Sequence, residues 1–349
     1  MFAASIHARR RSRRSRIFRK SWLNSPRAME LEARDFGAAE AGQTPYFPPI
    51  VVNRAARPQR SRIRVVLLNI AGDSRLSVVE ECLKRPPLRD PDVVLLCEAN
   101  TGTRRLRGFD VASELAAALD MSYAFVPEFG FKIGDDDTIV ERMGNAILCR
   151  QPLDEVVAVA MPSAPKSRLM PRRRRNVTRV GVPTGLYASA RFGGETITLG
   201  VAHLDSRCGP VRREQQLAVY MAEFPRSGRA IFGGDLNTTT TQLRRLSNLA
   251  AVGAQMIANP RRFRAPESRE PLFERIKEAG LETEGVNVKY RATFTFSGVI
   301  PHFMRPKLDW LAVRGLRAVA GSAAVIAPKM SIFSRRASDH DFVTVELDL

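Results

Sequence analysis

The sequence predicts an α/β fold, because runs typical of buried strands alternate with segments of helical spacing. Residues 63–70 (IRVVLLNI) and 92–97 (DVVLLC) are continuous apolar runs, as expected of strands that are covered on both faces. The pair Gly193-Gly194 separates two further apolar runs and signals a tight hairpin turn, because glycine tolerates positive φ. Together these features predict sheets and helices stacked in layers.

The remaining elements follow from the same patterns. Helices are expected at residues 74–84, with Asp73 or Ser74 as the cap, and at residues 111–119, 211–224 and 242–249. Further strands are expected at residues 146–149, 155–160, 185–192, 196–202, 230–232, 309–313 and 342–347. No apolar run approaches the roughly 20 residues that a membrane helix needs. The nearest, residues 316–328, is interpreted as a core strand.

The chain is expected to divide into a basic disordered tail and linker, residues 1–60, and one catalytic domain, residues 61–349. Residues 7–27 are rich in Arg and Ser and lack apolar periodicity, which predicts disorder, and residues 38–60 are rich in Pro and Ala. The tail lacks the apolar stretch of a secretory signal, so we expect a cytoplasmic protein. Two alternatives are an organellar transit peptide and a translation start at Met29.

Cysteine content and charge narrow the class of protein. Cys82, Cys97, Cys149 and Cys208 fit neither a disulfide framework nor the close pairs of a zinc site, so reduced thiols are expected. The formal net charge is +19, and nine of the positive charges lie in residues 1–28. Such a balance favours nucleic acid, anionic lipid or a phosphorylated substrate as partner. Because only 8 of the 55 basic residues are Lys, genome composition is an alternative explanation of this charge.

Two basic segments interrupt the alternation of strands and helices. Residues 162–178 (PSAPKSRLMPRRRRNVT) are bounded by prolines and contain Arg172–Arg175. Residues 254–270 carry three more arginines, Arg261, Arg262 and Arg264. Both segments are predicted to be surface loops.

Polar side chains interrupt or end six of the predicted strands. They are Asn69, Glu98, His203 with Asp205, Asp235 with Asn237, Asp309, and Asp339 with His340. Each alone could be a turn former or a structural histidine. In layered α/β folds, however, side chains at strand ends converge on one rim, where ligands bind. The set as a whole therefore predicts a functional site.

The residue types in this set are those of phosphoryl transfer to water. Oxygen ligands without cysteine favour Mg²⁺ or Mn²⁺ over zinc. Two histidines near carboxylates can transfer protons around neutral pH, and carboxamides can donate hydrogen bonds to phosphate oxygens. A serine hydrolase fits less well, because the sequence has no Gly-x-Ser-x-Gly motif.

These residues, in this order, resemble the endonuclease/exonuclease/phosphatase superfamily, which includes deoxyribonuclease I, exonuclease III-like enzymes and sphingomyelinases. The matching pieces are VVLLNI with Asn69, PDVVLLCE with Glu98, GNAILCR at 144–150, GVAHLDS with His203, GGDLN with Asp235 and Asn237, LDW with Asp309, and SDHDFV with Asp339 and His340. The resemblance covers residues 62–349. It implies a four-layer α/β/β/α sandwich of two mixed sheets with the site at one end.

The resemblance also implies roles for single residues. Glu98 would be the main ligand of Mg²⁺ or Mn²⁺, helped by Asn69 and Asp339. Asp309 would orient His340, which activates water or steadies the phosphate, and Asp235 is the competing candidate for the base. The residues that would hold phosphate oxygens are Asn237, His203 and Arg179.

Two departures from the family pattern argue against repair of abasic sites. Cys97 stands where the family usually has Gln, and Ala71 stands where repair enzymes carry an acid. The leading hypothesis is a metal-dependent phosphodiesterase that acts on nucleic acid. The alternatives are a phosphatase or phospholipase-like enzyme for a small or lipid phosphate, and a non-catalytic scaffold. A scaffold need not retain Glu98, Asp309 and His340, so it is disfavoured. The oligomeric state is left open.

Overall fold

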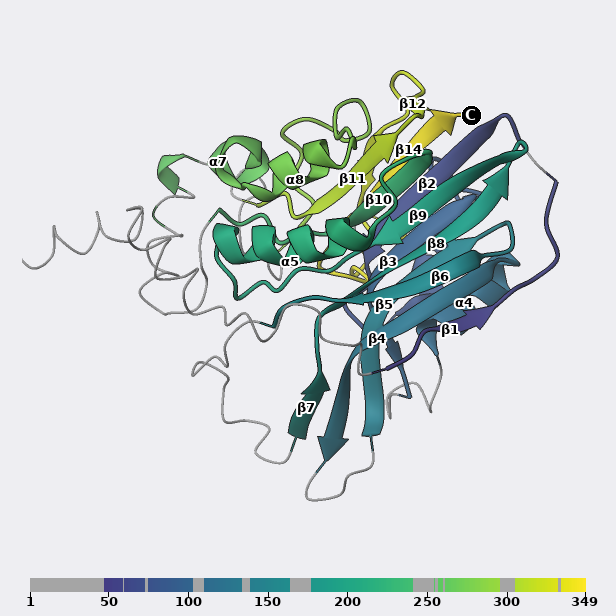
Figure 1. Cartoon of the computed structure of the whole chain (residues 1–349), viewed down its shortest axis with the longest axis horizontal. Helices are drawn as coiled ribbons and strands as arrows, with labels where there is room; N and C mark the ends of the chain where they lie inside the picture. The colour runs from purple at the N-terminus through teal and green to yellow at the C-terminus, as the bar shows by residue number, and fades with distance from the viewer. Residues whose placement is uncertain are drawn as a thin grey trace, which may run out of the picture.

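The computed structural model describes residues 47–58, 60–72, 75–102, 110–133, 139–163, 177–240, 254, 257–259, 261–295, 305–331 and 334–349. Within this part of the chain, two mixed β-sheets pack face to face and helices cover their outer faces (Figure 1). The predicted four-layer α/β/β/α sandwich is therefore confirmed.

The larger sheet has nine described strands in the order β1-β4-β5-β3-β2-β14-β12, with β13 paired to β14 and β7 paired to β4. They are β1 (Ile50–Val52), β2 (Arg62–Asn69), β3 (Val93–Thr101), β4 (Ser122–Ile133), β5 (Ile139–Cys149), β7 (Val177–Gly181), β12 (Arg317–Ala318), β13 (Ala324–Ile326) and β14 (Phe342–Asp348). Strands β2 and β3 run parallel and lie at the centre of the sheet. Their burial on both faces explains their continuous apolar runs.

The smaller sheet has five described strands in the order β11-β10-β9-β8-β6. They are β6 (Asp154–Ala160), β8 (Thr184–Phe192), β9 (Glu195–Val201), β10 (Arg229–Asp235) and β11 (Asp309–Arg314). The expected hairpin is confirmed, because Phe192 pairs with Glu195 across Gly193 and Gly194, whose φ angles are 57° and 85°. Strands β9 and β10 are parallel, and this pairing directs the chain after both strands toward the same edge.

Three apolar clusters hold the four layers together. The first fills the space between the two sheets and contains Leu67, Leu95 and Val201. The second packs helices α3 (Leu76–Leu83) and α4 (Val111–Leu119) on the outer face of the larger sheet. The third packs α5 (Pro210–Glu223) and α8 (Leu272–Glu278) on the outer face of the smaller sheet. Burial of apolar surface on both sides of each sheet is the main stabilising term.

The helices predicted at residues 111–119 and 211–224 are confirmed to within a residue, and the predicted strands that the structure describes form with longer or slightly shifted bounds. The cap expected for α3 is wrong, because its N-cap is Arg75 without a side-chain cap bond. Asp73, Ser74 and the helix expected at 242–249 lie outside the described residues.

Three other expectations are corrected. The folded region starts before Ser61, because Ile50–Val52 pair with Tyr123–Phe125 of β4. Residues 316–328 form two short, half-exposed strands instead of one core strand, because a turn at Gly321, with φ of 74°, divides them. Residues 254–270 are not all loop, since they contain α7 (Arg261–Arg264) and a 3₁₀ turn, η4 (Glu267–Arg269).

The sequence patterns missed three further elements, for separate reasons. Strand β4 was missed because Pro127, Glu128 and Gly130 break its pattern of apolar side chains. Strand β7 begins inside the basic segment that was expected to be a loop, and α8 is only seven residues long.

The four cysteines are buried thiols outside any disulfide within the described residues, which agrees with the expected reduced thiols. No helix in this part of the chain is long and apolar enough to cross a membrane.

A buried ion pair ties α5 to the segment that follows β10. The Arg213 side chain donates from Nε and Nη2 to the Glu270 carboxylate at 3.3 and 2.6 Å, and both side chains are fully buried. The same carboxylate accepts the Thr240 backbone N–H at 2.6 Å. Arg213 also donates to the Cys208 carbonyl. One buried pair therefore fixes the chain just beyond Asp235.

We predict that Arg213→Ala lowers the free energy of unfolding by about 3–5 kcal/mol, because it leaves the Glu270 carboxylate buried and unpaired. The measurement is reversible urea unfolding. Arg275→Ala is the matched control. Arg275 of α8 pairs at the surface with Glu214, which follows Arg213 in α5. Exposed pairs contribute about 0–1 kcal/mol. Equal losses in the two variants would contradict the proposed difference between buried and exposed pairs.

Candidate active site

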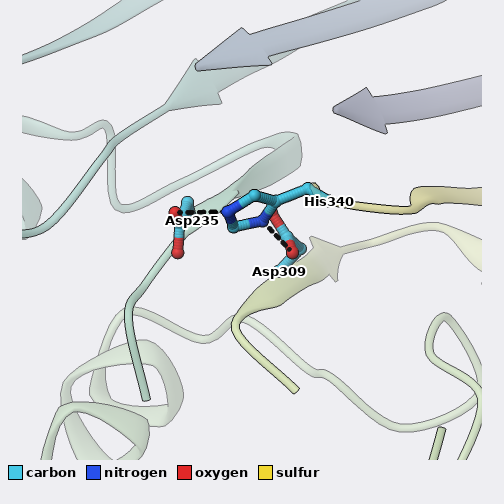
Figure 2. A group of neighbouring side chains, drawn as sticks. All are labelled: Asp235, Asp309 and His340. Atoms are coloured by element: carbon cyan, nitrogen blue, oxygen red, sulfur yellow. Dashed lines mark hydrogen bonds and ion pairs between the residues drawn. The ribbon is translucent and has the colours of Figure 1, made fainter. Parts of the chain in front are cut away.

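Two carboxylates and an imidazole meet where strands β10 and β11 come together (Figure 2). Asp235 and Asp309 are direct cross-strand partners at the end of β10 and the start of β11. The His340 imidazole lies between them, with Nδ1 2.8 Å from Oδ2 of Asp309 and Nε2 3.6 Å from Oδ2 of Asp235. All three side chains are at least 94 % buried. The arrangement is a carboxylate–imidazole pair with a second carboxylate on the other ring nitrogen.

The segment before β14 is tied down at several points, which fixes His340. The Ser338 hydroxyl donates to the Asn69 carbonyl at 2.7 Å and accepts the His340 backbone N–H at 3.0 Å. The Phe294 ring packs against the imidazole with 4.8 Å between centroids. Arg336 donates to the His340 carbonyl at 3.0 Å. The orientation of His340 is therefore set by backbone and side-chain contacts from both sheets.

His203 connects this group to two further acids. Its Nε2 lies 3.7 Å from Oδ2 of Asp235 and 3.7 Å from Oε1 of Glu98. Its Nδ1 lies 3.5 Å from Oε2 of Glu128. His203 follows β9, and Gln216 of α5 accepts the Asp205 backbone N–H at 3.1 Å, which anchors the chain just after it. Both ring nitrogens of His203 therefore face carboxylates.

Glu128 is a site residue that the sequence analysis missed. Its side chain is 1 % exposed and accepts a hydrogen bond of 3.0 Å from Nδ2 of Asn145. The same Asn145 amide donates to the Thr184 carbonyl at 2.8 Å, so the carboxylate is held from the neighbouring sheet. A signal was present, because Glu128 is the one acid in the apolar run SYAFVPEFGF, and it sits at a β-bulge between Pro127 and Phe129.

Two asparagines act on the Asp235 carboxylate. Asn69 donates from Nδ2 to Oδ2 at 2.9 Å, and its own Oδ1 accepts the Ala71 backbone N–H. The backbone N–H of Asn237 donates to Oδ1 at 3.0 Å, and its side-chain amide donates to the Leu204 carbonyl at 2.7 Å. Asn237 has a φ of 49°, a left-handed conformation that asparagine tolerates better than most residues. In this arrangement both asparagines orient Asp235 and the adjoining loops.

The other candidates are more exposed than the buried group. Glu98 sits at a β-bulge in β3 with a φ of 54°, and its side chain is 30 % exposed beside the buried group. Asp339 is exposed, and in the described residues its side chain has no hydrogen bond to the group. Arg179 of β7 is exposed and stacks on Phe129, with its guanidinium carbon 3.9 Å from the ring centroid. The structure thus brings together six of the nine expected site residues, together with Glu128. The six are Asn69, Glu98, His203, Asp235, Asp309 and His340. Asn237 lies at the edge of this group, and Asp339 and Arg179 lie at its periphery.

The charges of the group shift its proton equilibria. Burial disfavours a charged imidazole, but Asp309 and Asp235 outweigh it and raise the pKa of His340 to about 10. Burial is likewise outweighed at His203, where Glu128 and Asp235 raise the pKa to about 10. Burial raises the pKa of Asp235 to about 6, against the lowering effect of His340. Without a metal ion, both imidazoles are therefore cations at neutral pH and can donate hydrogen bonds to an anion.

The donor set also suits a cation. Ligand atoms of Asp235, Asp309 and His340 lie within 4.8 Å of one another, which makes them a possible metal site. In the described part of the chain, Oδ1 of Asp309 is buried and has no hydrogen-bond partner. An oxygen-rich set of this kind fits a hard divalent ion.

Comparison with known proteins assigns the family. Residues 66–340 match the model of the Endonuclease/Exonuclease/phosphatase family. The chain belongs to this family. A search of curated protein sequences finds no match.

Solved structures of the family share the fold. An endonuclease/exonuclease/phosphatase from Beutenbergia cavernae is 20 % identical, covers 83 % of this chain and 72 % of its own, and gives a TM-score of 0.52. A family protein from Leptotrichia buccalis is 14 % identical and gives a TM-score of 0.52. The match covers 82 % of this chain and 100 % of the Leptotrichia protein. An endonuclease/exonuclease/phosphatase from Bacteroides vulgatus is 14 % identical and gives a TM-score of 0.52. The match covers 83 % of this chain and 100 % of the Bacteroides protein. At these identities the likeness establishes the fold alone.

In this member of the endonuclease/exonuclease/phosphatase family, the Cys97 side chain packs against the backbone of Asp235. Its sulfur is 3.5 Å from the Asp235 backbone nitrogen and 3.8 Å from the Ala202 carbonyl oxygen. Burial raises the pKa of its thiol well above the ordinary value, so it stays neutral. Gly234 contributes to the same close approach, since a Cβ there would lie 1.8 Å from the Ala202 oxygen. Cys97 is thus a small, neutral packing residue behind the site.

We predict that His340→Ala lowers kcat by roughly 10²–10⁴-fold on a small chromogenic phosphodiester, because the variant loses a positioned proton donor or acceptor. Asp309→Asn should lower kcat less, since the imidazole remains. His340→Ala should also destabilise the fold, because two buried carboxylates lose their counter-charge.

Initial rates at a temperature where circular dichroism shows both variants folded provide the measurement. Retention of more than about half of the wild-type kcat by His340→Ala, with chemistry still rate-limiting, would make the pair structural.

Proposed function

We propose that this chain is a divalent-metal-dependent phosphodiester hydrolase that acts on nucleic acid. The observation that carries the proposal is the buried His340–Asp309 pair, with Asp235 on the second ring nitrogen and the half-exposed Glu98 across His203. This arrangement supports the proposal, because hydrogen-bond donors lie beside oxygens that could hold a cation at one rim of the sandwich. A structural role alone would not require five ionisable side chains with shared contacts.

We propose Mg²⁺ or Mn²⁺ as the cofactor, with Glu98 as the main ligand and Asp235 within reach of the same position. Both side chains approach Nε2 of His203 to 3.7 Å, so their oxygens border one space. When bound, a divalent cation supplies positive charge to the phosphate and lowers the pKa of a water. Asn69 and Asp339 stay candidate ligands, although the Asn69 oxygen accepts the Ala71 N–H in this structure.

The residues of this chain would divide the remaining work. Asp309 holds Nδ1 of His340 protonated, which leaves Nε2 to exchange a proton with water or to donate to a phosphate oxygen. Asp235 lies at the same nitrogen and has a pKa raised to about 6, as a general base near neutral pH requires. His203, held by Glu128, would donate to a phosphate oxygen as negative charge builds in the transition state.

Charge supports nucleic acid as the substrate class. The chain has a formal net charge of +19, which favours a long polyanion over a single phosphate group. Arg172–Arg175 lie outside the described residues. Arg264 is the last residue of α7. The 3₁₀ turn η4 begins at Glu267, shortly after this helix, and ends just before Glu270.

We predict that EDTA abolishes hydrolysis of a small chromogenic diester and that Mg²⁺ or Mn²⁺ restores it. Glu98→Gln should lower kcat by more than about 10²-fold. The protein should stay folded, because the side chain is partly exposed and its ion pair is with His203. Glu81→Gln, on the outer helix α3, is the matched control and should be neutral. Full turnover in EDTA after dialysis would refute the metal requirement.

We predict that neutralising Arg172–Arg175 weakens binding of DNA or RNA and flattens its salt dependence. Each phosphate neutralised on duplex DNA contributes a slope of about 0.9 log units per log unit of salt. Hydrolysis of the small diester should be unchanged, because that substrate does not reach beyond the site. If both substrates respond equally, or neither does, these arginines are not nucleic-acid contacts, and a small or lipid phosphate becomes the better candidate.

A further inference from the structure

Three strands extend past the body of the sandwich and form a projection next to the site. We call it the β-arm and define it as residues 129–133 of β4, residues 139–143 of β5, and β7 (Val177–Gly181). In Figure 1 β7 and the ends of β4 and β5 extend below the other strands of the larger sheet, to which they belong. The arm is continuous with the catalytic centre, because Glu128 immediately precedes its first residue.

Strand register shows which side chains share a face of the arm. Phe131 pairs with Glu141 of β5 and with Arg179 of β7, so these three side chains lie on one face. Phe129, two residues back, lies on the same face, which the stacking of Arg179 on its ring confirms.

This face is turned toward the catalytic centre. Asn100, two residues after Glu98 in β3, donates from Nδ2 to the Glu141 carboxylate at 2.9 Å. The guanidinium of Arg179 lies within electrostatic range of Arg207 and Asp205, in the loop that follows His203. The face that carries Phe131 therefore borders the site on two sides.

The opposite face of the arm is covered by the chain itself. Phe47 is 6 % exposed and packs so closely that a Cβ on Gly130 would lie 2.8 Å from its ring. Arg142 lies over the same ring, 5.2 Å from its centroid. On the site-facing side, by contrast, Phe131 is half-buried and Arg179 is exposed. Within the described residues, an aromatic ring and a cation thus remain accessible beside the site.

We propose that the site-facing side of the β-arm binds an unpaired nucleobase adjacent to the scissile phosphate, with Phe131 as the stacking ring and Arg179 as the neighbouring phosphate contact. The inference rests on the phosphodiesterase function proposed above and narrows its substrate to single-stranded nucleic acid. Stacking on an aromatic side chain needs a base that is free of its own stack, and it tolerates any base. The Glu141 carboxylate in the same row disfavours an anionic membrane surface as the occupant.

Full-length protein with Mg²⁺ tests the proposal on three substrates. They are a short single-stranded DNA, the same strand with abasic nucleotides around the cleaved linkage, and a small chromogenic diester. Wild-type protein should have a lower KM for the strand that carries bases. Phe131→Ala should raise that KM by roughly 5- to 100-fold, the equivalent of one lost stacking contact, and leave the other two substrates unchanged.

Two further variants keep the result interpretable. Phe131→Trp retains a ring and should preserve the low KM, which excludes a general folding defect. Arg142→Ala is the matched control for Arg179→Ala, because both arginines lie over a phenylalanine ring but on opposite faces of the arm. Only Arg179→Ala should flatten the salt dependence of binding to single-stranded DNA.

Quenching of 2-aminopurine fluorescence in EDTA reports stacking without turnover. Wild-type protein should quench it and Phe131→Ala should not. Equal KM for the abasic and base-containing strands, or equal quenching by both proteins, would overturn the proposal and leave the phosphodiesterase function intact. Loss of binding to phosphatidylserine vesicles but not to DNA in Phe131→Ala would also overturn it. No turnover of the small diester would instead refute the phosphodiesterase function, and the fluorescence result would still decide the stacking.

Discussion

The direct pairing of Asp235 with Asp309 is the constraint on which the site depends. The two residues face each other across β10 and β11, and their side chains are at least 97 % buried. Two carboxylates that are close together and stripped of water repel each other unless a cation lies nearby. His340 supplies this charge through both ring nitrogens, and a divalent ion is a second cation that the same oxygens can hold. The segment before β14 must therefore pass over the ends of these two strands.

Neutral groups complete the support of the two aspartates, through the carboxylate of Asp235 and the backbone of Asp309. Asn69 and the Asn237 backbone each donate to one oxygen of Asp235, while Thr293 accepts the Asp309 backbone N–H at 3.0 Å. Cys97 fills the space behind them without adding charge. A buried polar network of this kind holds one geometry, because each missing hydrogen bond would leave an unsatisfied group. The network also links the two sheets at one edge, because Asn69 of β2 in the larger sheet donates to Asp235 of β10 in the smaller sheet.

Under the function proposed above, the choice of substrate would depend on residues outside this buried network. Glu98 at its bulge and the β-arm beside it are partly exposed, so they can meet a substrate without altering the group of Asp235, Asp309 and His340. This separation is consistent with a fold whose chemistry stays constant while its bordering loops and strands differ. The arm adds an aromatic and cationic surface to a site that is otherwise made of acids, amides and imidazoles.

The sequence by itself determined the alternation of strands and helices, the hairpin at Gly193-Gly194 and the family, because these depend on local apolar patterns and short ordered motifs. It also predicted that His203, Asp235 and His340 lie close together, as they do in the structure, since polar residues at strand ends stand out against apolar runs. Only the tertiary structure showed that Glu128 belongs to the site. The lone acid in the apolar run of β4 marks an unusual position, but only the packing of the two sheets shows that its carboxylate contacts His203.

Pairing partners were likewise decided by tertiary structure. Strand β1 was hidden in a Pro-rich segment and forms because β4 offers it an edge. The distinction between the two faces of the β-arm depends on the register of β4 with the next strand, β5, and with β7, which lies farther along the chain. Sequence periodicity assigns a side chain to one of two faces of a strand, and only the packing of distant segments decides which face meets the substrate and which is buried.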